Sequence, residues 1–266
     1  MSITALFIEA HPGEIERFAG GFAVLLRQHK HNVYFLCATD GSKSHYENRY
    51  MLDSDLLARK RYKESVESAQ SIGASFLTLG IPEEELYVTP ANNEEMVRMI
   101  RSAGIDGAGP DIIITARPYQ GHRDQRCMCQ MILDAISMLQ IPAVCPDTPC
   151  IHRLPAMIYW KDVITEPSPF TSHVTVPIDD VLTKKAALID YHHSTYNEWL
   201  AWIEKQKNGM QKNTVGGVMT SLERCKSENA LCAVQSSKKD VRYGELYQIS
   251  SYGAAISGED IHSLIS

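Results

Sequence analysis

The sequence predicts an α/β fold with a mostly parallel sheet and helices on both of its faces. Short apolar runs alternate with amphipathic stretches through the first 140 of the 266 residues. The apolar runs contain few polar residues, which is typical of strands buried on both faces of a parallel sheet. After Gln140 the alternation stops and prolines become frequent. We therefore expect one domain over residues 1–266, with a core at about 1–140 and a C-terminal elaboration at about 141–266.

The predicted elements of the core follow one another in strand–helix order. The strands share an almost wholly apolar character and lie at Thr4–Ala10, Asn32–Ala38, Ser75–Leu79 and Asp111–Thr115. The helices have apolar residues at helical spacing and lie at Glu16–Gln28, Leu57–Ile72, Asn92–Ser102 and Arg126–Leu139. Gly73 follows the second helix, at the position where glycine commonly ends one.

The C-terminal elaboration gives weaker signals. Strands are predicted at Ala156–Trp160, at Val174–Pro177 and late in the chain at residues 241–252. A long helix is predicted over Asp180–Lys205, because apolar and aromatic residues recur through it. The polar stretch Lys205–Lys212 is predicted to be a loop.

Composition and charge exclude several classes of protein. Lys and Arg total 26 against 32 Asp and Glu, a net charge of −6, whereas nucleic-acid-binding proteins usually present a basic face. The longest apolar run, Phe18–Leu26, is far shorter than the roughly 20 residues of a membrane-spanning helix. No secretory signal is visible, and the 7 scattered cysteines fit reduced thiols. We therefore expect a globular, cytoplasmic protein with no nucleic-acid partner and no membrane span.

Polar residues follow three of the predicted strands, where an open parallel sheet binds its ligands. His11 and Glu14 follow the first strand, and the turn Thr39-Asp40-Gly41 follows the second. The segment Arg117–Gln125 follows the fourth. Two of these loops carry a histidine with a carboxylate two or three residues later, and imidazole and carboxylate are common zinc ligands. The sequence thus predicts a site for a small molecule, with zinc as a candidate cofactor.

Each of these residues also has an ordinary structural explanation. His11 can pack at the end of a strand, and Glu14 and Glu16 can stabilise the positive end of a helix. Asp124 can cap the helix that it precedes. Asp40 followed by glycine is a common turn signal. Residue types and spacing alone leave both explanations open.

A nucleotide cofactor is not expected. The first strand is not followed by G-x-G-x-x-G, and the pair Gly20-Gly21 lies inside the predicted helix, too late to cradle a pyrophosphate. The sequence also contains neither a G-x-S-x-G nucleophile elbow nor a Walker phosphate-binding loop.

Together the loops resemble the PIG-L/LmbE-type family of zinc-dependent de-N-acetylases. The family's first motif, A-H-P-D-D-x-E followed by Gly-Gly, corresponds to Ala10–Glu16 and Gly20-Gly21. Its last motif, H-P-D-H, corresponds to His122–Gln125. Weaker similarities extend the resemblance over most of residues 4–203. The resemblance implies a Rossmann-like sheet and hydrolysis of N-acyl groups from amino sugars and related small molecules.

Three positions depart from the family pattern. Gly13 replaces the family's general-base aspartate, Glu14 replaces an aspartate that binds zinc, and Gln125 replaces the last histidine ligand. Losing a positioned base costs about 10²–10⁴-fold in rate. An amide oxygen is also a poorer zinc ligand than imidazole. The ordinary zinc mechanism is therefore not assured for this chain.

The site that the resemblance implies has three groups of residues. The expected zinc ligands are His11, Glu14 and Gln125, and zinc is expected to be weakly bound or absent. The expected catalytic residues are Glu14, His122 and Asp124, of which His122 stabilises the oxyanion or acts as an acid. Substrate contacts are expected from Asp40, Arg61, Arg117 and Tyr119.

Three functions remain open on the sequence alone. The favoured one is a divergent hydrolase that cleaves the N-acyl bond of a polar amine- or sugar-bearing substrate. The second is a metal-free enzyme of a small-molecule pathway that uses Glu14 and His122 as an acid/base pair. The third is a non-catalytic member that binds a sugar-like ligand or serves as a partner subunit. Analogy with related proteins also favours a homo-oligomer.

Overall fold

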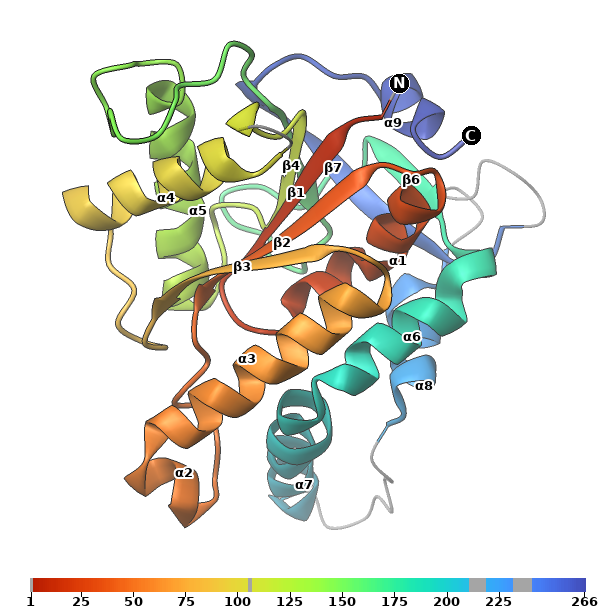
Figure 1. Ribbon diagram of the computed structural model, residues 1–266. Helices are drawn as coiled ribbons and strands as arrows, with labels where there is room; N and C mark the ends of the chain where they lie inside the picture. The colour runs from red at the N-terminus through yellow and green to blue at the C-terminus, as the bar shows by residue number, and fades with distance from the viewer. Residues whose placement is uncertain (1, 105–106, 211–218, 232–240) are drawn as a thin grey trace.

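A seven-stranded sheet in the order β3-β2-β1-β4-β5-β7-β6 forms the centre of the computed structural model, which describes residues 2–104, 107–210, 219–231 and 241–266 (Figure 1). The strands that run in one direction are β1 (Thr4–Glu9), β2 (Asn32–Thr39), β3 (Ser75–Ile81), β4 (Ile112–Thr115), β5 (Ala156–Trp160) and β6 (Val174–Pro177). Strand β7 (Gly244–Gly253) is antiparallel to both of its neighbours, β5 and β6. The predicted mostly parallel α/β sheet is confirmed.

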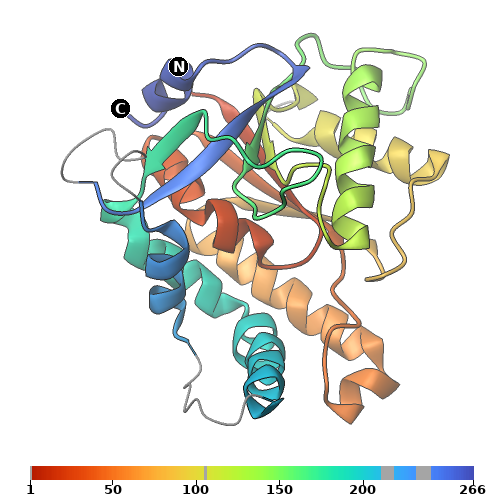
Figure 2. The same ribbon diagram turned by 180° about the vertical axis from the view of Figure 1, so that it is seen from behind.

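Helices cover both faces of the sheet (Figures 1 and 2). One face carries the long helices α1 (Glu14–Gln28), α3 (Ser54–Ser71) and α6 (Leu182–Tyr191). The other carries α4 (Pro90–Ser102) and α5 (Arg123–Met138). In α1 the apolar residues Ile15, Phe22 and Leu26 are fully buried, as the helical spacing predicts. Strands β1 and β4 are parallel neighbours, so their carboxyl ends lie at the same edge of the sheet.

The predicted helix over Asp180–Lys205 is helical along most of its length but is interrupted at His192. A short 3-10 turn (Asp179–Val181) and α6 precede the break, and a π-helical stretch (Ser194–Trp199) follows it. At the break Ser194 donates its backbone N–H to Glu64, at 3.0 Å, and its hydroxyl to the same carboxylate, at 2.6 Å. Side-chain partners thus replace helical hydrogen bonds at this point.

The predicted loop over Lys205–Lys212 is wrong over its described part, since α7 (Leu200–Met210) continues through it. Residues 211 and 212 lie outside the described residues. Three short helices were not predicted from the sequence: α2 (Asn48–Leu52), α8 (Ser221–Asn229) and α9 (Gly258–Ser263). None of them carries a long apolar period, so the pattern that finds the core helices does not find these.

One hydrophobic cluster extends from Ala5 in β1 to Ile261 in α9. It therefore joins the expected core to the expected elaboration, which supports a single domain, although that organisation stays a prediction. Among the described helices, none combines the length and the apolar character that crossing a bilayer requires. The six described cysteines form no disulfide, and Cys232 lies outside the described residues.

The pair Gly20-Gly21 gives a stability prediction. A Cβ on Gly21 would lie 2.6 Å from Ile178 Cγ2 and 2.9 Å from Glu245 Oε1, whereas a Cβ on Gly20 would lie at ordinary contact distance, 3.5 Å from Leu188. We expect Gly21→Ala to lower the free energy of unfolding by about 1–3 kcal/mol, because the core must move to admit the methyl group. Gly20→Ala is the matched control, and urea unfolding should show it unchanged or slightly stabilised. Equal effects of the two substitutions would contradict this explanation.

Candidate functional site

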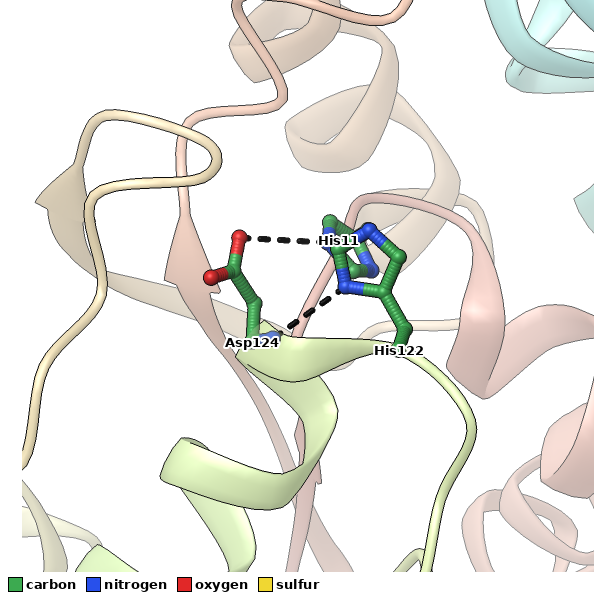
Figure 3. Close-up of side chains that lie close together, drawn as sticks. All are labelled: His11, His122 and Asp124. Atoms are coloured by element: carbon green, nitrogen blue, oxygen red, sulfur yellow. Dashed lines mark hydrogen bonds and ion pairs between the residues drawn. The ribbon is translucent and has the colours of Figure 1, made fainter.

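The turns that follow β1 and β4 meet at the carboxyl edge of the sheet (Figure 3). His11 follows β1, and His122 caps the N-terminus of α5. Their imidazole rings lie 4.4 Å apart between centroids and nearly perpendicular, at 85°. Both rings line a cavity of about 230 Å³. Two turns more than a hundred residues apart in the chain therefore share one hollow, as the positions of their strands predict.

The start of α5 fixes His122 and Asp124. His122 Nδ1 accepts the backbone N–H of Asp124 at 3.2 Å, and His122 Nε2 lies 3.0 Å from Glu84 Oε1. Asp124 is fully buried, and its Oδ2 accepts the backbone N–H of Glu84 at 2.7 Å. Its Oδ1 accepts from Arg123 Nη2 at 2.8 Å. The loop after β3 thus holds both residues in place, a contact that could not be predicted from residue types and spacing.

The start of α1 fixes His11 through Glu14. Glu14 Oε1 lies 2.9 Å from His11 Nδ1 and accepts from Gln125 Nε2 at 2.6 Å. Glu14 Oε2 accepts the backbone N–H groups of Ala10, at 3.0 Å, and of His11, at 3.3 Å. Four donors therefore surround this carboxylate. Gln125 acts here as a hydrogen-bond donor.

Two of the three expected zinc ligands, Glu14 and Gln125, are hydrogen-bonded to each other. Glu14 Oε1 lies between two donors, and Gln125 directs its amide nitrogen, which cannot bind a metal, toward this group. His11, Glu14 and Gln125 do meet, but as a hydrogen-bonded group in which the amide replaces a ligand. This arrangement does not fit a cation coordinated by these three residues.

A neighbouring set of residues can hold a cation. His11, His122 and Asp124 each offer one ligand atom, and these atoms lie within 4.8 Å of one another (Figure 3). His11 Nε2 is buried, has no hydrogen-bond partner among the described residues, and lies 3.6 Å from Asp124 Oδ2. Imidazole nitrogen and carboxylate oxygen are both ligands that zinc accepts. The residues present therefore fit a divalent cation, although not with the expected ligands.

The charges of the site are strongly coupled. Burial disfavours a charge on His11, but Glu14 and Asp124 outweigh it and raise the pKa of His11 to about 10. Burial also disfavours ionised Glu14, yet His11 and Gln125 together hold the pKa of Glu14 below its usual value. The pKa of Asp124 is likewise lowered, since contacts with His11 and Glu84 outweigh burial. Both carboxylates are therefore ionised at neutral pH and are weak proton acceptors.

Gly13 stands where the family has its general base, and neighbouring side chains fill the space beside it. Gly13 has φ +100°, and a Cβ there would lie 3.1 Å from both His192 Cγ and Tyr196 Cε2. The Tyr196 hydroxyl donates to the carbonyl of Gly13 at 2.8 Å. Glu16 does not replace the base, because it is buried outside the cavity, where its carboxylate accepts from the Ser68 hydroxyl at 2.7 Å.

Of the four expected substrate contacts, only Arg61 lines the cavity. Its side chain is 2% exposed and donates to the carbonyls of Gly41, at 2.5 Å, and Ser44, at 2.9 Å, so it holds the loop after β2. Asp40 Oδ1 accepts the backbone N–H groups of Ser42, at 2.9 Å, and of Glu83, at 3.0 Å. Asp40 therefore stabilises the turn after β2, which is the structural explanation considered above. Asp40 lies outside this cavity.

Arg117 and Tyr119 also lie outside this cavity, contrary to expectation. Arg117 is bound in a two-pronged ion pair with Asp162, at 2.6 and 2.8 Å, and donates to the carbonyl of Ile164 at 2.8 Å. Tyr119 is 49% exposed. Asp162 is distant from Arg117 in the sequence and belongs to no recognisable motif. The ion pair between the two residues therefore could not be predicted.

Glu83 is a cavity residue that was not predicted from the sequence. Its Oε2 accepts the backbone N–H groups of Lys43, at 2.8 Å, and Ser44, at 2.9 Å. Burial disfavours its charge, but the nearby Arg61 outweighs this and lowers the pKa of Glu83. Glu83 therefore adds a fixed negative charge to the cavity rather than a free base.

A second, larger cavity of about 550 Å³ adjoins the first. The two share the side chains of Arg17, Phe18 and Gln125. Arg17 is bound to Glu228 at 2.7 and 3.0 Å, and Phe18 stacks on Trp160. The second cavity also has Lys161 and Asp162 on its wall, so its lining is partly charged.

Another group of metal-ligating side chains, formed by His45, Glu47 and Glu198, gives a prediction about acid stability. Lys60 Nζ already binds Glu198, at 2.7 and 2.9 Å, and His45 Nε2 lies 3.0 Å from the same carboxylate. Burial raises the pKa of Glu198, but Lys60 and His45 outweigh this and lower it to about 2. The ammonium group of Lys60 takes the place that a cation would need.

We expect Glu198→Gln to reduce the loss of stability in acid. A carboxyl group whose folded pKa is depressed stabilises the fold above its unfolded pKa, and this contribution is lost as the pH falls through the folded value. The window therefore runs from about 4.5 down to about 2. Unfolding followed in urea across this window should show a smaller decline in the variant than in the unchanged protein. Parallel curves would mean that Glu198 does not contribute.

The fold and the first cavity define an α/β enzyme with its histidines at the carboxyl ends of β1 and β4. Residues 6–136 match the family model described as PIG-L: GlcNAc-PI de-N-acetylase. Over this segment the chain is similar to the PIG-L family of hydrolytic deacetylases. A comparison with curated proteins gave no match.

Solved structures share the fold. An N,N'-diacetylchitobiose deacetylase from Pyrococcus horikoshii is 21% identical, with a TM-score of 0.69, over 92% of this chain and 83% of that one. GalB, the 4-carboxy-2-hydroxymuconate hydratase from Pseudomonas putida, is 16% identical, with a TM-score of 0.68, over 97% and 99%. The zinc-inhibited form of the teicoplanin deacetylase Orf2 is 13% identical, with a TM-score of 0.60, over 93% and 98%.

Proposed function

We propose that the protein hydrolyses the N-acyl bond of a polar, amine- or sugar-bearing small molecule. The observation that carries this proposal is the pair of imidazoles, His11 and His122, on the wall of one cavity at the carboxyl edge of the sheet. The match to a deacetylase family over the segment that contains both histidines supports it. The deacetylases among the structural neighbours add support for the fold.

The reacting centre in this proposal consists of His11, His122 and Asp124. Glu14 positions His11, because its carboxylate lies 2.9 Å from Nδ1 and leaves Nε2 directed away from it. Glu14 and Asp124 are not proposed as general bases, since their pKa values are lowered. A divalent cation, when bound, would polarise the acyl carbonyl and lower the pKa of a water molecule.

The second cavity supports a substrate larger than its acyl group. It opens from the reacting cavity across Arg17, Phe18 and Gln125, so a molecule cleaved beside His122 can extend into it. The apolar side chain of Phe18 and the ammonium group of Lys161 suit the apolar faces and hydroxyls of a sugar. We propose that the amine-bearing part of the substrate lies there.

The test is incubation of the full-length protein with zinc and a panel of N-acetylated amino sugars and N-acetylated amines. Equal amounts of acetate and free primary amine should form. His122→Asn is the control for trace contamination by another deacetylase. If no member of the panel yields amine above this control, hydrolysis is the wrong reaction.

A hydratase is the second candidate, because the GalB hydratase matches this chain over nearly the full length of both. The described carboxylates that line the reacting cavity, Glu14 and Glu83, are both hydrogen-bonded and have lowered pKa values, so neither is a free base of the kind that the family's hydrolases use. Water addition would change an unsaturated carboxylic acid without releasing acetate or amine. The same assay, with an unsaturated hydroxy acid in the panel, therefore separates the two reactions.

The location and the oligomeric state of the protein are also proposals. We propose a cytoplasmic location from the scattered cysteines and the acidic balance of the chain. Analogy with related proteins supports a homo-oligomer. Size-exclusion chromatography with light scattering would measure the assembly, and a mass equal to one chain would exclude the homo-oligomer.

A further inference from the structure

The geometry points to a zinc-type divalent-cation site formed by His11, His122 and Asp124. This set differs from His11, Glu14 and Gln125, which correspond to the zinc ligands of the family. Figure 3 shows the Asp124 carboxylate directed toward His11, and the three ligand atoms of the set lie within 4.8 Å of one another. The inference concerns the same centre as the proposed function, but it requires no particular reaction there.

His11 has the arrangement of a metal-binding histidine. Its Nδ1 lies 2.9 Å from Glu14 Oε1, while its buried Nε2 forms no hydrogen bond within the part of the chain that the structure describes. Histidines that bind a metal commonly donate their other ring N–H to a carboxylate, which fixes the tautomer. The ion pair of His11 Nε2 with Asp124 Oδ2 is long, at 3.6 Å, so a bound cation that displaces the Nε2 proton would replace a weak contact with two coordination bonds. Glu14 thus supports a ligand instead of being one.

His122 repeats the same arrangement with a different carboxylate. Its Nε2 lies 3.0 Å from Glu84 Oε1, which leaves Nδ1 with its lone pair. Nδ1 accepts one contact, the 3.2 Å cap bond from the Asp124 backbone N–H. A cation would compete only with this long hydrogen bond. Both histidines therefore have one nitrogen held by a carboxylate and the other available as a ligand.

The carboxylate of Asp124 completes the set. Its Oδ2 lies 3.6 Å from His11 Nε2, which is too far for a hydrogen bond. Two ligands at about 2.0–2.2 Å from one tetrahedral ion are about 3.3–3.6 Å apart, so this separation suits coordination. Oδ2 has one other contact, the Glu84 backbone N–H, while Arg123 binds Oδ1. One lone pair of Oδ2 therefore stays available.

The departures from the family pattern fit this assignment. The longer side chain of Glu14 reaches back to the backbone N–H groups of Ala10 and His11 and holds the imidazole. The amide nitrogen of Gln125 then donates a hydrogen bond to Glu14 Oε1 at 2.6 Å. Glu14 and Gln125, which match zinc ligands in the family, thus support His11, and the start of α5 supplies the other two ligands, His122 and Asp124.

The test is zinc and cobalt titration of the full-length protein after a chelator has removed any bound metal. Calorimetry should give one ion per chain, and cobalt should produce the visible absorption of a low-symmetry site. His122→Asn and Asp124→Asn should weaken binding at least about 100-fold, because they remove ligands. Glu14→Gln should weaken it about 10–100-fold, as loss of an outer partner does. Gln125→Ala should change it only a few-fold.

Two results would overturn the inference. One is the absence of stoichiometric binding to the unchanged protein. The other is binding that Gln125→Ala abolishes and His122→Asn does not, which would assign the ion to the family ligands. Asparagine is a good N-cap, so His122→Asn keeps the start of α5, and circular dichroism checks the fold. Binding without turnover would contradict the proposed function alone, and turnover without binding would contradict this inference alone.

Discussion

His122→Asn is expected to lower kcat/KM for N-acyl hydrolysis at least about 100-fold. His122 lines the reacting cavity and packs against His11 with a centroid distance of 4.4 Å. Loss of an outer partner of a metal site already costs roughly 10–100-fold, and loss of a ligand should cost at least as much. Steady-state rates of amine release on the best substrate of the panel measure the effect.

The matched control for this prediction is His29→Asn. His29 is an exposed histidine at the C-terminal end of α1, remote from the cavity. It undergoes the same change of side chain, so kcat/KM should stay as in the unchanged protein. If His122→Asn keeps full activity while the protein hydrolyses its substrate, then His122 does not belong to the reacting centre.

The meeting of His11 and His122 could be predicted from the sequence because it depends on strand direction alone. Apolar runs identify β1 and β4, and parallel strands place their carboxyl ends at one edge. The residues after each strand then converge whatever the details of the loops. The paired state of Arg117 could not be predicted in this way. It depends on Asp162, whose position is set by a loop after β5 that has no periodic pattern.

The side chains that surround Gly13 also could not be predicted from the sequence. The sequence shows that Gly13 has no side chain, but it does not show that His192 and Tyr196 fill the space beside it. Both residues come from the break after α6, and the sequence predicts a continuous helix there. The break depends on tertiary partners such as Glu64, which binds Ser194 from α3. Local propensity cannot reveal a helix end that a distant side chain creates.

Substitution of Lys185 gives the largest expected loss of stability. Lys185 Nζ binds Glu245 Oε1 at 2.6 Å, and both side chains are 0% exposed. Glu245 also accepts the backbone N–H groups of Gly21, at 2.7 Å, and Phe22, at 2.8 Å. The pair therefore ties α6 and β7 to the middle of α1, where the glycine allows the carboxylate to approach the backbone.

Lys185→Met is expected to lower the free energy of unfolding by about 3–5 kcal/mol, because it leaves the carboxylate of Glu245 buried without its cation. Replacing Glu245 by Gln in the same chain removes that charge and keeps one of the two oxygen acceptors that the backbone of α1 uses. The double variant should therefore be more stable than Lys185→Met alone. Urea unfolding of the single and double variants measures both differences. If the second substitution restores nothing, the cost of Lys185→Met comes from lost packing around α6 and not from the uncompensated charge.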